Sequence, residues 1–512
     1  MPLGSVRTGE KMKPSAAVVG VVTFTDPRDT GLAVERETYL CNSHRGMVRL
    51  LAKGGAKVID PMKRLRRGWT ERDTFGLRTK REVEKAIEIL LSGRVECLVI
   101  GSWHWTEPIL PIMLVRELDI PVLLYANHNP TWAGSTFLSS TGASFWENAA
   151  NENMLRHQRL QGRPERVMPW VRGVAAGSKL SRGSLLLWGP SYCLRMEHLQ
   201  DDLPGLKSFM VGDFVMEAQY SLVRRAEQLL EEGKRIESMI AWLGRSGCNI
   251  EFDGKMLDQE SLRREVALYL AAKDSVADKG LEGEDIMGAS IRCQPELSVE
   301  YGVTPCMIPS FLPFPEDFEG PKPVIPVVCE GDVKGLVTCA MLHLMNPGAP
   351  PLFGDLKYVD DNLMIISNCG GASVFYSELS PCASECLPQV WIKGQCQGAS
   401  GGAVGFFSRP SEVTLARLTR IDGDYWMQYG RGRITEMTEE VKSKILWGKM
   451  WPNTPIELSA PRDLLISAAG SNHYSATVGD MTLEIEAFCR MHGIPKVRMD
   501  SETELQAFID MI

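Results

Sequence analysis

The stretch "VVCEGDVKGLVTCAMLHLMNPGAPPLFGDLKY", residues 327–358, contains two apolar runs that each end on a carboxylate. The first run ends at Glu330 and the second at Asp355, with the helix-like segment "VKGLVTCAMLHLM" between them. Short apolar runs are typical of buried strands, and the segment between them has about the length of a crossover connection. We therefore expect the second run to return beside or near the first, so that both acids converge at one edge.

A carboxylate at the end of a buried strand must be paired, protonated or bound to a metal, because an unpaired buried charge is very costly. Either acid alone could cap a neighbouring helix or pair with a lysine such as Lys334 or Lys357. For one acid taken alone this structural role is the favoured interpretation. The equivalent places of Glu330 and Asp355 favour a shared site instead.

A third candidate lies in "RDLLISAAGSNHYSATVGD", residues 462–480, where a strand-like apolar run ends near Gly470 and Ser-Asn-His follows. His473 is one of 8 histidines and sits among small residues, where a backbone can approach a ligand closely. A solvent-exposed loop histidine is the alternative. Two carboxylates and an imidazole suit Mn²⁺, Mg²⁺ or Co²⁺ better than thiolate-bound zinc, and three ligands leave positions for two vicinal substrate oxygens.

The rest of the chain predicts an α/β fold of two doubly wound, parallel-sheet (Rossmann-like) domains followed by a β-rich, barrel-like C-terminal domain. From "AAVVGVVTF" (16–24) onward, short apolar strands alternate with amphipathic helices, including one long helix over 220–243. From about Gly348, short β segments are separated by Gly and Pro. The clearest hairpin is "LTRIDGDYWMQY" (418–429), with Asp422-Gly423 in its turn.

A chain of 512 residues is too long for one core. We expect an N-terminal domain over 12–178, a second domain with Glu330 over 179–346, and a C-terminal domain with Asp355 and His473 over 347–512.

Composition excludes several function classes. The net charge of −8 gives no basic surface for nucleic acid, and no apolar segment approaches the about 18 residues of a membrane span. The first twenty residues have no apolar core, so we expect no signal peptide. The 13 cysteines lack paired spacing, which indicates reduced thiols and a cytoplasmic location.

Five motifs occur in an order and spacing that are hard to obtain by chance, over roughly residues 285–480. They are "IRCQPELSVEYGVTPC" (291–306), "CEGDVKGLVTCAMLHLM" (329–345), "GDLKYVDDNLMIISNCG" (354–370), "VTLARL" (413–418) and "GSNHYS" (470–475). This ordered set resembles the L-fucose isomerase-like family of sugar isomerases, which is related to the L-arabinose isomerases.

The resemblance implies a metal-dependent aldose–ketose isomerase that acts on a free sugar through an enediol(ate). Glu330, Asp355 and His473 would take the family's metal-ligand places, with Mn²⁺ as the expected cofactor and Mg²⁺ or Co²⁺ as alternatives, and the two acids would also take its acid/base roles. Family members form homo-oligomers, often hexamers. By position, the expected sugar contacts are Trp103, Trp105, Gln294 and Asn472.

One departure bears on the substrate. Where related sequences commonly read His-Cys-Gly, this chain reads Asn368-Cys369-Gly370, so a further imidazole is missing. The substrate therefore stays open. Arg28, Arg45 and Arg292 lie in or near candidate loops and could recognise an anionic sugar, such as a sulfonated or phosphorylated one; solvated or structural roles are the alternative. Two other functions remain as alternatives: a non-catalytic sugar-binding protein, and a metal-dependent epimerase or aldolase.

Overall fold

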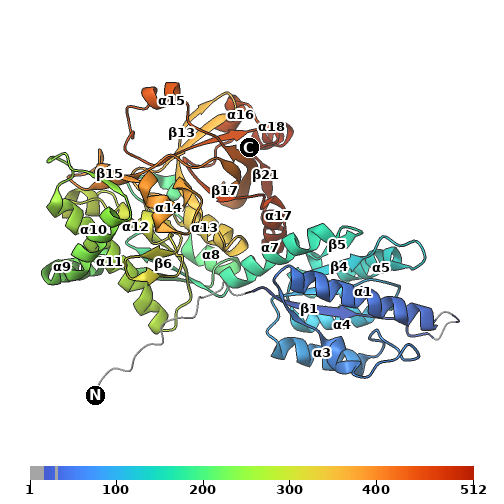
Figure 1. The fold of residues 1–512 in the computed structure, drawn as a ribbon. Helices are drawn as coiled ribbons and strands as arrows, with labels where there is room; N and C mark the ends of the chain where they lie inside the picture. The colour runs from blue at the N-terminus through green and yellow to red at the C-terminus, as the bar shows by residue number, and fades with distance from the viewer. Residues whose placement is uncertain (1–15, 29–30, 32) are drawn as a thin grey trace, which may run out of the picture. The chain divides into compact units, whose positions relative to one another are not determined.

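The computed structural model describes residues 16–28, 31 and 33–512, and its chain divides into two compact units (Figure 1). The N-terminal unit comprises the described residues up to Lys179 together with Leu483–Gly493, and the main unit comprises Leu180–Thr482 and Ile494–Ile512. The predicted start of the first domain, residue 12, lies outside the described residues. So does most of the N-terminal segment, residues 1–20, in which we expect no signal peptide. The three predicted domain boundaries stay predictions.

The N-terminal unit is built on a five-stranded parallel sheet with the order β2-β1-β3-β4-β5. Its central strands are almost continuously apolar and buried, as expected for strands covered on both faces. The order reverses at β1, which places crossover helices on both faces of the sheet. The strands are β1 (Val18–Thr23), β2 (Lys57–Ile59), β3 (Cys97–Gly101), β4 (Val122–Ala126) and β5 (Gln158–Gln161). The helices are α1 (Ala33–Lys53), α2 (Pro61–Leu65), α3 (Lys80–Ser92), α4 (Ile109–Leu118), α5 (Gly134–Glu147), α6 (Glu152–Leu155), α7 (Val167–Leu180) and α17 (Thr482–His492).

The main unit begins with a second parallel sheet, of four strands in the order β12-β9-β6-β7. Its strands are β6 (Ser184–Trp188), β7 (Asp213–Glu217), β9 (Ile286–Ile291) and β12 (Val327–Val328). The helices of this region are α8 (Leu203–Phe209), α9 (Gln219–Glu232), α10 (Lys234–Arg245), α11 (Gln259–Leu281), α12 (Met307–Phe311) and α13 (Val333–Met345). A small sheet of β8 (Asn249–Glu251), β15 (Trp391–Gly394) and β16 (Gly402–Gly405) belongs to the same unit.

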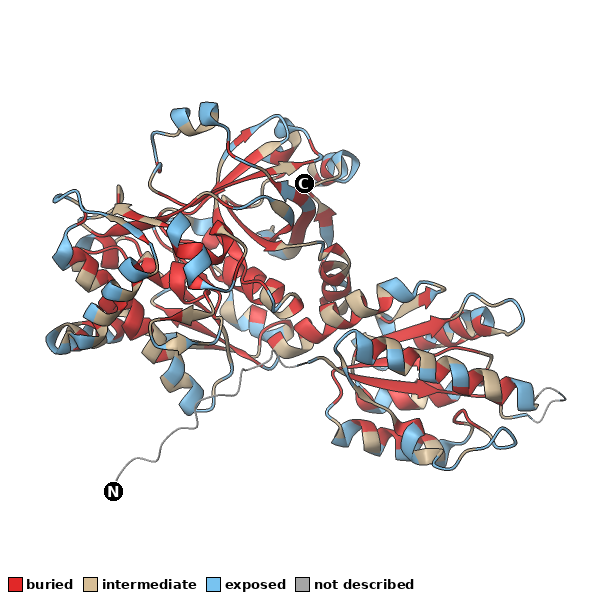
Figure 2. Cartoon of the chain, viewed as in Figure 1, coloured by how far each residue is buried: buried red, intermediate tan, exposed pale blue. Residues whose placement is uncertain are grey.

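A closed antiparallel barrel completes the main unit. Its six strands follow the order β17-β20-β13-β14-β19-β18, and the pairing of β17 with β18 closes the ring. They are β13 (Leu352–Asp360), β14 (Leu363–Ser367), β17 (Ser411–Ile421), β18 (Asp424–Ile434), β19 (Asn453–Leu458) and β20 (His473–Val478). Strand β21 (Lys496–Arg498) adds to β18 in parallel, and the accompanying helices are α14 (Ala383–Cys386), α15 (Glu439–Lys444), α16 (Arg462–Ser467) and α18 (Glu502–Met511). Buried residues line the strands of both sheets and of the barrel (Figure 2).

These sheets confirm the predicted fold class, and the predicted hairpin is present. Ile421 pairs with Asp424, so the turn consists of Asp422 and Gly423 alone. Both turn residues have positive φ, 48° and 91°, which is the conformation that a two-residue hairpin turn requires. No helix of the described residues has the length and apolarity needed to cross a membrane.

Three local expectations are wrong. Asp355 does not end its strand, because β13 continues to Asp360; this strand belongs to the barrel, while β12 pairs with β9. The strand expected over "RDLLIS" is helix α16. The single helix expected over 220–243 is two helices, because Gly233 has φ +68° and separates α9 from α10.

Candidate active site

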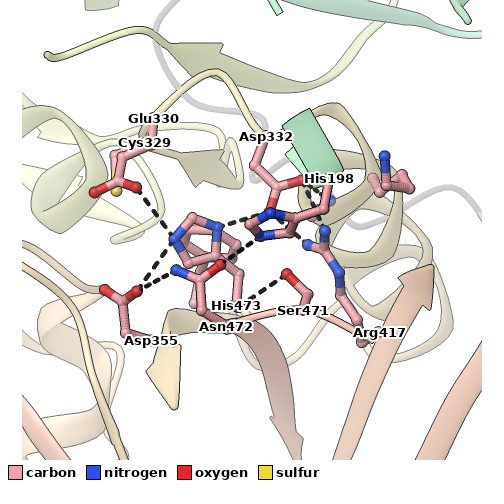
Figure 3. A network of polar contacts seen from close by, with 12 residues as sticks. His198, Cys329, Glu330, Asp332, Asp355, Arg417, Ser471, Asn472 and His473 are labelled. Atoms are coloured by element: carbon pink, nitrogen blue, oxygen red, sulfur yellow. Dashed lines mark hydrogen bonds and ion pairs between the residues drawn. The ribbon is translucent and has the colours of Figure 1, made fainter. Parts of the chain in front are cut away.

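Glu330, Asp355 and His473 lie together in the main unit (Figure 3). Glu330 follows β12, Asp355 is in β13, and His473 is the first residue of β20 instead of a loop residue. His473 Nε2 lies 3.4 Å from Glu330 Oε2 and 3.4 Å from Asp355 Oδ1. The structure therefore brings the three predicted ligands together, with one donor atom from each within 4.8 Å of the others.

The position of Asp355 relative to His473 is fixed by strand pairing. Strands β13 and β20 are antiparallel neighbours, and Asp355 is directly opposite His473 in the ladder. Directly opposed residues project to the same face of a sheet. The carboxylate and the imidazole therefore reach the same space because of the backbone register.

Glu330 is presented by a tight turn between β12 and α13. Its φ is +63°, and the next residue, Gly331, has φ +67°. A side chain at Gly331 would meet the Pro190 oxygen and the Tyr192 nitrogen at 2.7 Å, so only glycine fits. The Glu330 residue is only 6% exposed. The left-handed backbone costs about 1–3 kcal/mol, which the surrounding packing must offset.

Asp332 and Arg417 hold the imidazole from its other side (Figure 3). Asp332 Oδ2 lies 2.8 Å from His473 Nδ1 and accepts a 2.5 Å hydrogen bond from Arg417 Nη1. Asp332 Oδ1 caps α13 by accepting from the Gly335 amide. Burial alone would raise the pKa of Asp332, but the Arg417 guanidinium and the imidazole hold it well below its ordinary value. Asp332 is thus a buried, ionised carboxylate that accepts the Nδ1–H hydrogen bond and directs Nε2 towards the two acids.

The Nε2 atom of His473 is buried and makes no hydrogen bond among the described residues. Burial opposes a charged imidazole, but the carboxylates of Asp355, Asp332 and Glu330 raise the pKa of His473 well above its ordinary value. An imidazole nitrogen without a hydrogen bond, facing two carboxylate oxygens, is a donor set that fits a divalent cation of the Mn²⁺ type. Such a cation would take the place of the Nε2 proton.

Asn472 extends the site at its more open side. Its side-chain nitrogen donates to Asp355 Oδ1 at 2.6 Å, and its Oδ1 lies 2.7 Å from His198 Nε2. The Asp355 side chain is 29% exposed, whereas that of His473 is 1% exposed. A ligand would therefore reach the donor set past Asp355 and Asn472.

Gln294, Trp103 and Trp105 are the other predicted sugar contacts. Gln294 is buried after β9, where its side-chain oxygen accepts from Ser298. Trp103 and Trp105 belong to the N-terminal unit. Trp103 is 2% exposed and its indole nitrogen donates to Thr23, while Trp105 is half-buried with Arg28 over its ring at 4.7 Å. A sugar-binding role for these three residues stays a prediction.

Sequence reasoning missed Asp332 and Arg417. Their signals were an aspartate two residues after Glu330, at the start of a helix, and an arginine within the apolar run "VTLARL". The lysines weighed as partners of the two acids are used elsewhere: Lys334 pairs with Asp201, and Lys357 donates to the Trp447 carbonyl. The amide of Asn368 is used structurally, since its oxygen accepts from the Gly371 amide at 3.0 Å.

In the main unit a parallel sheet is joined to a closed barrel, and a set of two acids and an imidazole, of which Glu330 and His473 are buried, lies where they meet. These features define the class as an α/β enzyme. Residues 366–500 match the family described as L-fucose isomerase, C-terminal domain. The sulfoquinovose isomerase of Priestia aryabhattai is 19% identical over 424 residues, covering 80% of this chain and 87% of the relative. That of Alkalicoccus urumqiensis is 22% identical over 410 residues, covering 76% and 82%. These matches support an L-fucose isomerase-like family of sugar isomerases, and they indicate that the chain is an aldose–ketose isomerase, an intramolecular oxidoreductase.

Proposed function

We propose that this isomerase depends on a divalent cation held by Glu330, Asp355 and His473, and that its substrate is a sulfonated deoxy hexose. The observation that carries the metal site is the buried Nε2 of His473, which makes no hydrogen bond among the described residues and lies 3.4 Å from an oxygen of each acid. Mn²⁺ is the proposed cation, with Mg²⁺ and Co²⁺ as alternatives, because oxygen and imidazole ligands suit these ions.

The reaction moves a proton between C1 and C2 of the sugar while the carbonyl moves the other way. A bound cation supplies Lewis acidity towards the two vicinal oxygens of the sugar. Glu330 and Asp355 flank the imidazole, and we assign them the acid/base work, which typically contributes about 10²–10⁴-fold. Asn472 orients Asp355 through its 2.6 Å hydrogen bond.

The sulfonated substrate is supported by the relatives, which are sulfoquinovose isomerases. Their alignments cover about four fifths of this chain. A homo-oligomer, with a hexamer favoured, is supported by the family resemblance. A cytoplasmic location is supported by the thiols: all 13 cysteines are free, as in reducing compartments.

The test is an aldose screen with the metal controlled. Protein treated with EDTA is incubated with sulfoquinovose, glucose, L-fucose and D-arabinose, with and without Mn²⁺, and the products are identified by NMR. We expect a ketose only in the presence of metal, and fastest formation from sulfoquinovose. Turnover that survives complete removal of metal would contradict the metal site, and a neutral sugar as the best substrate would contradict the sulfonated one.

The same screen in D₂O separates the alternative functions. An isomerase gives a ketose, an epimerase gives a second aldose, and an aldolase gives two fragments. A non-catalytic sugar-binding protein would bind a sugar without converting any of them.

Replacing Asp332 with asparagine should weaken Mn²⁺ binding by about 10–100-fold, because outer carboxylates orient a metal-binding imidazole and make it more basic. Binding is measured by electron paramagnetic resonance of free Mn²⁺. Asp463→Asn is the matched control, because its side chain is 89% exposed on α16. Unchanged Mn²⁺ affinity in folded Asp332→Asn protein would remove Asp332 from this positioning role.

A further inference from the structure

Glu330 faces a group of thiols as well as the imidazole. Its Oε2 points to His473 Nε2, whereas its Oε1 accepts a 3.4 Å contact from the Cys369 thiol. Cys329 precedes Glu330 directly, and one donor atom from each of Cys329, Glu330 and Cys369 lies within 4.8 Å of the others. The Cys293 thiol contacts Cys329. Thus the two oxygens of one carboxylate face two different donor sets.

The spacing of this second set fits a tetrahedral metal site. Zn–S bonds of about 2.3 Å and Zn–O bonds of about 2.0–2.2 Å at tetrahedral angles place ligand atoms about 3.5–3.8 Å apart. The 3.4 Å between Cys369 Sγ and Glu330 Oε1 is close to that separation. Cys293, whose thiol contacts Cys329, is a candidate donor for a fourth position.

The set is enclosed but can be reached. Cys329 is 5% exposed and Glu330 6%, whereas Cys369 is only partly buried. Asn368 holds Cys329 in place, with its amide nitrogen 3.4 Å from the sulfur. A cation can therefore enter past Cys369 and be bound by groups that the fold already positions.

The two donor sets prefer different cations. The first offers oxygen and imidazole ligands, while the second offers thiolates, which select soft ions such as Zn²⁺ and Cd²⁺. We propose that Cys329, Cys369 and Glu330 form a second site, here called the thiol site, for a soft divalent cation, and that a cation there takes Glu330 away from His473 and Asp355. The thiol site makes the enzyme sensitive to Zn²⁺ and Cd²⁺ through a carboxylate that both sites share.

The thiol site is tested first by ultraviolet absorbance, without any activity measurement. Cd²⁺ is titrated into the full-length protein with saturating Mg²⁺ and a non-chelating reductant. Thiolate-to-Cd²⁺ charge transfer gives an absorbance band that the sulfur-free first set cannot produce. We expect this band to saturate at one Cd²⁺ per chain, with the intensity expected for two or three thiolate ligands.

Variants then assign the band. Cys329→Ser/Cys369→Ser should lose it, Cys369→Ser alone should weaken it, and Cys382→Ser, at an exposed thiol, should keep it. If the double variant does not fold, the single variant Cys369→Ser still tests the site, since Cys369 is partly exposed and its replacement should leave the fold intact. The thiol site is contradicted if wild type shows no band, if folded double variant keeps it, or if Cys382→Ser abolishes it.

The sharing of Glu330 is tested by release of Mn²⁺. Addition of one equivalent of Cd²⁺ to Mn²⁺-loaded protein should raise the signal of free Mn²⁺ in wild type, and much less in Cys369→Ser. Equal release from both proteins would contradict the sharing. A protein that binds no Mn²⁺ at all contradicts the proposed metal-dependent function, and the Cd²⁺ band still decides the thiol site.

Discussion

Replacing Glu330 with glutamine should lower kcat for the sugar isomerisation by about 10³-fold or more, since it removes both a proton-transfer group and a charged metal ligand. Glutamine has nearly the same shape, and the tight turn at Glu330 and Gly331 is held by backbone packing that the change leaves intact. We therefore expect folded protein with little turnover. The measurement is kcat at saturating Mn²⁺, together with circular dichroism to check the fold.

Glu457→Gln is the matched control. Glu457 lies in β19 of the same barrel and pairs with Arg433 at the surface, so the same chemical change there should leave kcat unchanged. Asp355→Asn should resemble Glu330→Gln. Activity of folded Glu330→Gln within about 10-fold of wild type would remove Glu330 from acid/base work, whose usual contribution is larger.

Replacing Arg417 with methionine should destabilise the main unit by about 3–5 kcal/mol, the usual cost of removing one partner of a buried ion pair. Arg417 and Asp332 are both 0% exposed, and loss of the guanidinium removes the cation that is hydrogen-bonded to the buried Asp332 carboxylate. Mn²⁺ affinity should also fall, because Asp332 orients His473. Urea unfolding followed by circular dichroism gives the free energy of unfolding.

Arg433→Met is the control for this prediction. The Arg433–Glu457 pair is exposed, 60% and 38%, and pairs of this kind contribute about 0–1 kcal/mol. Only the buried arginine should therefore have a large effect. A loss below about 1 kcal/mol in Arg417→Met would mean that Asp332 is not held as a buried charge by that arginine.

The parts of the fold that could be predicted are those with local signals. Continuous apolar strands between amphipathic helices predicted the parallel sheets, and the Asp422-Gly423 turn predicted the hairpin of β17 and β18. The family and the enzyme class inferred from the ordered motifs are confirmed by the matches to relatives.

The wrong expectations fall where local signals are ambiguous. "RDLLIS" is too short for periodicity to separate helix from strand, and Asp463 after Pro461 favours a helix start. The apolar run ending at Asp355 reads like a parallel strand, but its neighbours are β14 and β20, which follow it in the chain. Pairing between distant segments decides such cases, and a single sequence does not record it.

The candidate site, too, could be predicted from the sequence only in part. The sequence indicated Glu330 and Asp355 by their places at the ends of apolar runs and His473 by its place among small residues, and the resemblance implied the metal-ligand role of all three. Arg417 could not be assigned to Asp332 from the sequence, because 85 positions separate the two and each has nearer residues of opposite charge. The catalytic and metal-binding roles of all these residues remain predictions until the variants are measured.

Asp355 and His473 are paired on the adjacent strands β13 and β20 of a closed barrel, so neither strand is an edge strand. Neither strand can shift by one residue without turning its whole row of side chains to the opposite face. The connecting segments around the rim do not set this pairing, so they can vary in length and composition while the donor pair stays in place. Evolution of new sugar preferences, or their design, can therefore proceed by exchange of rim segments on an unchanged core.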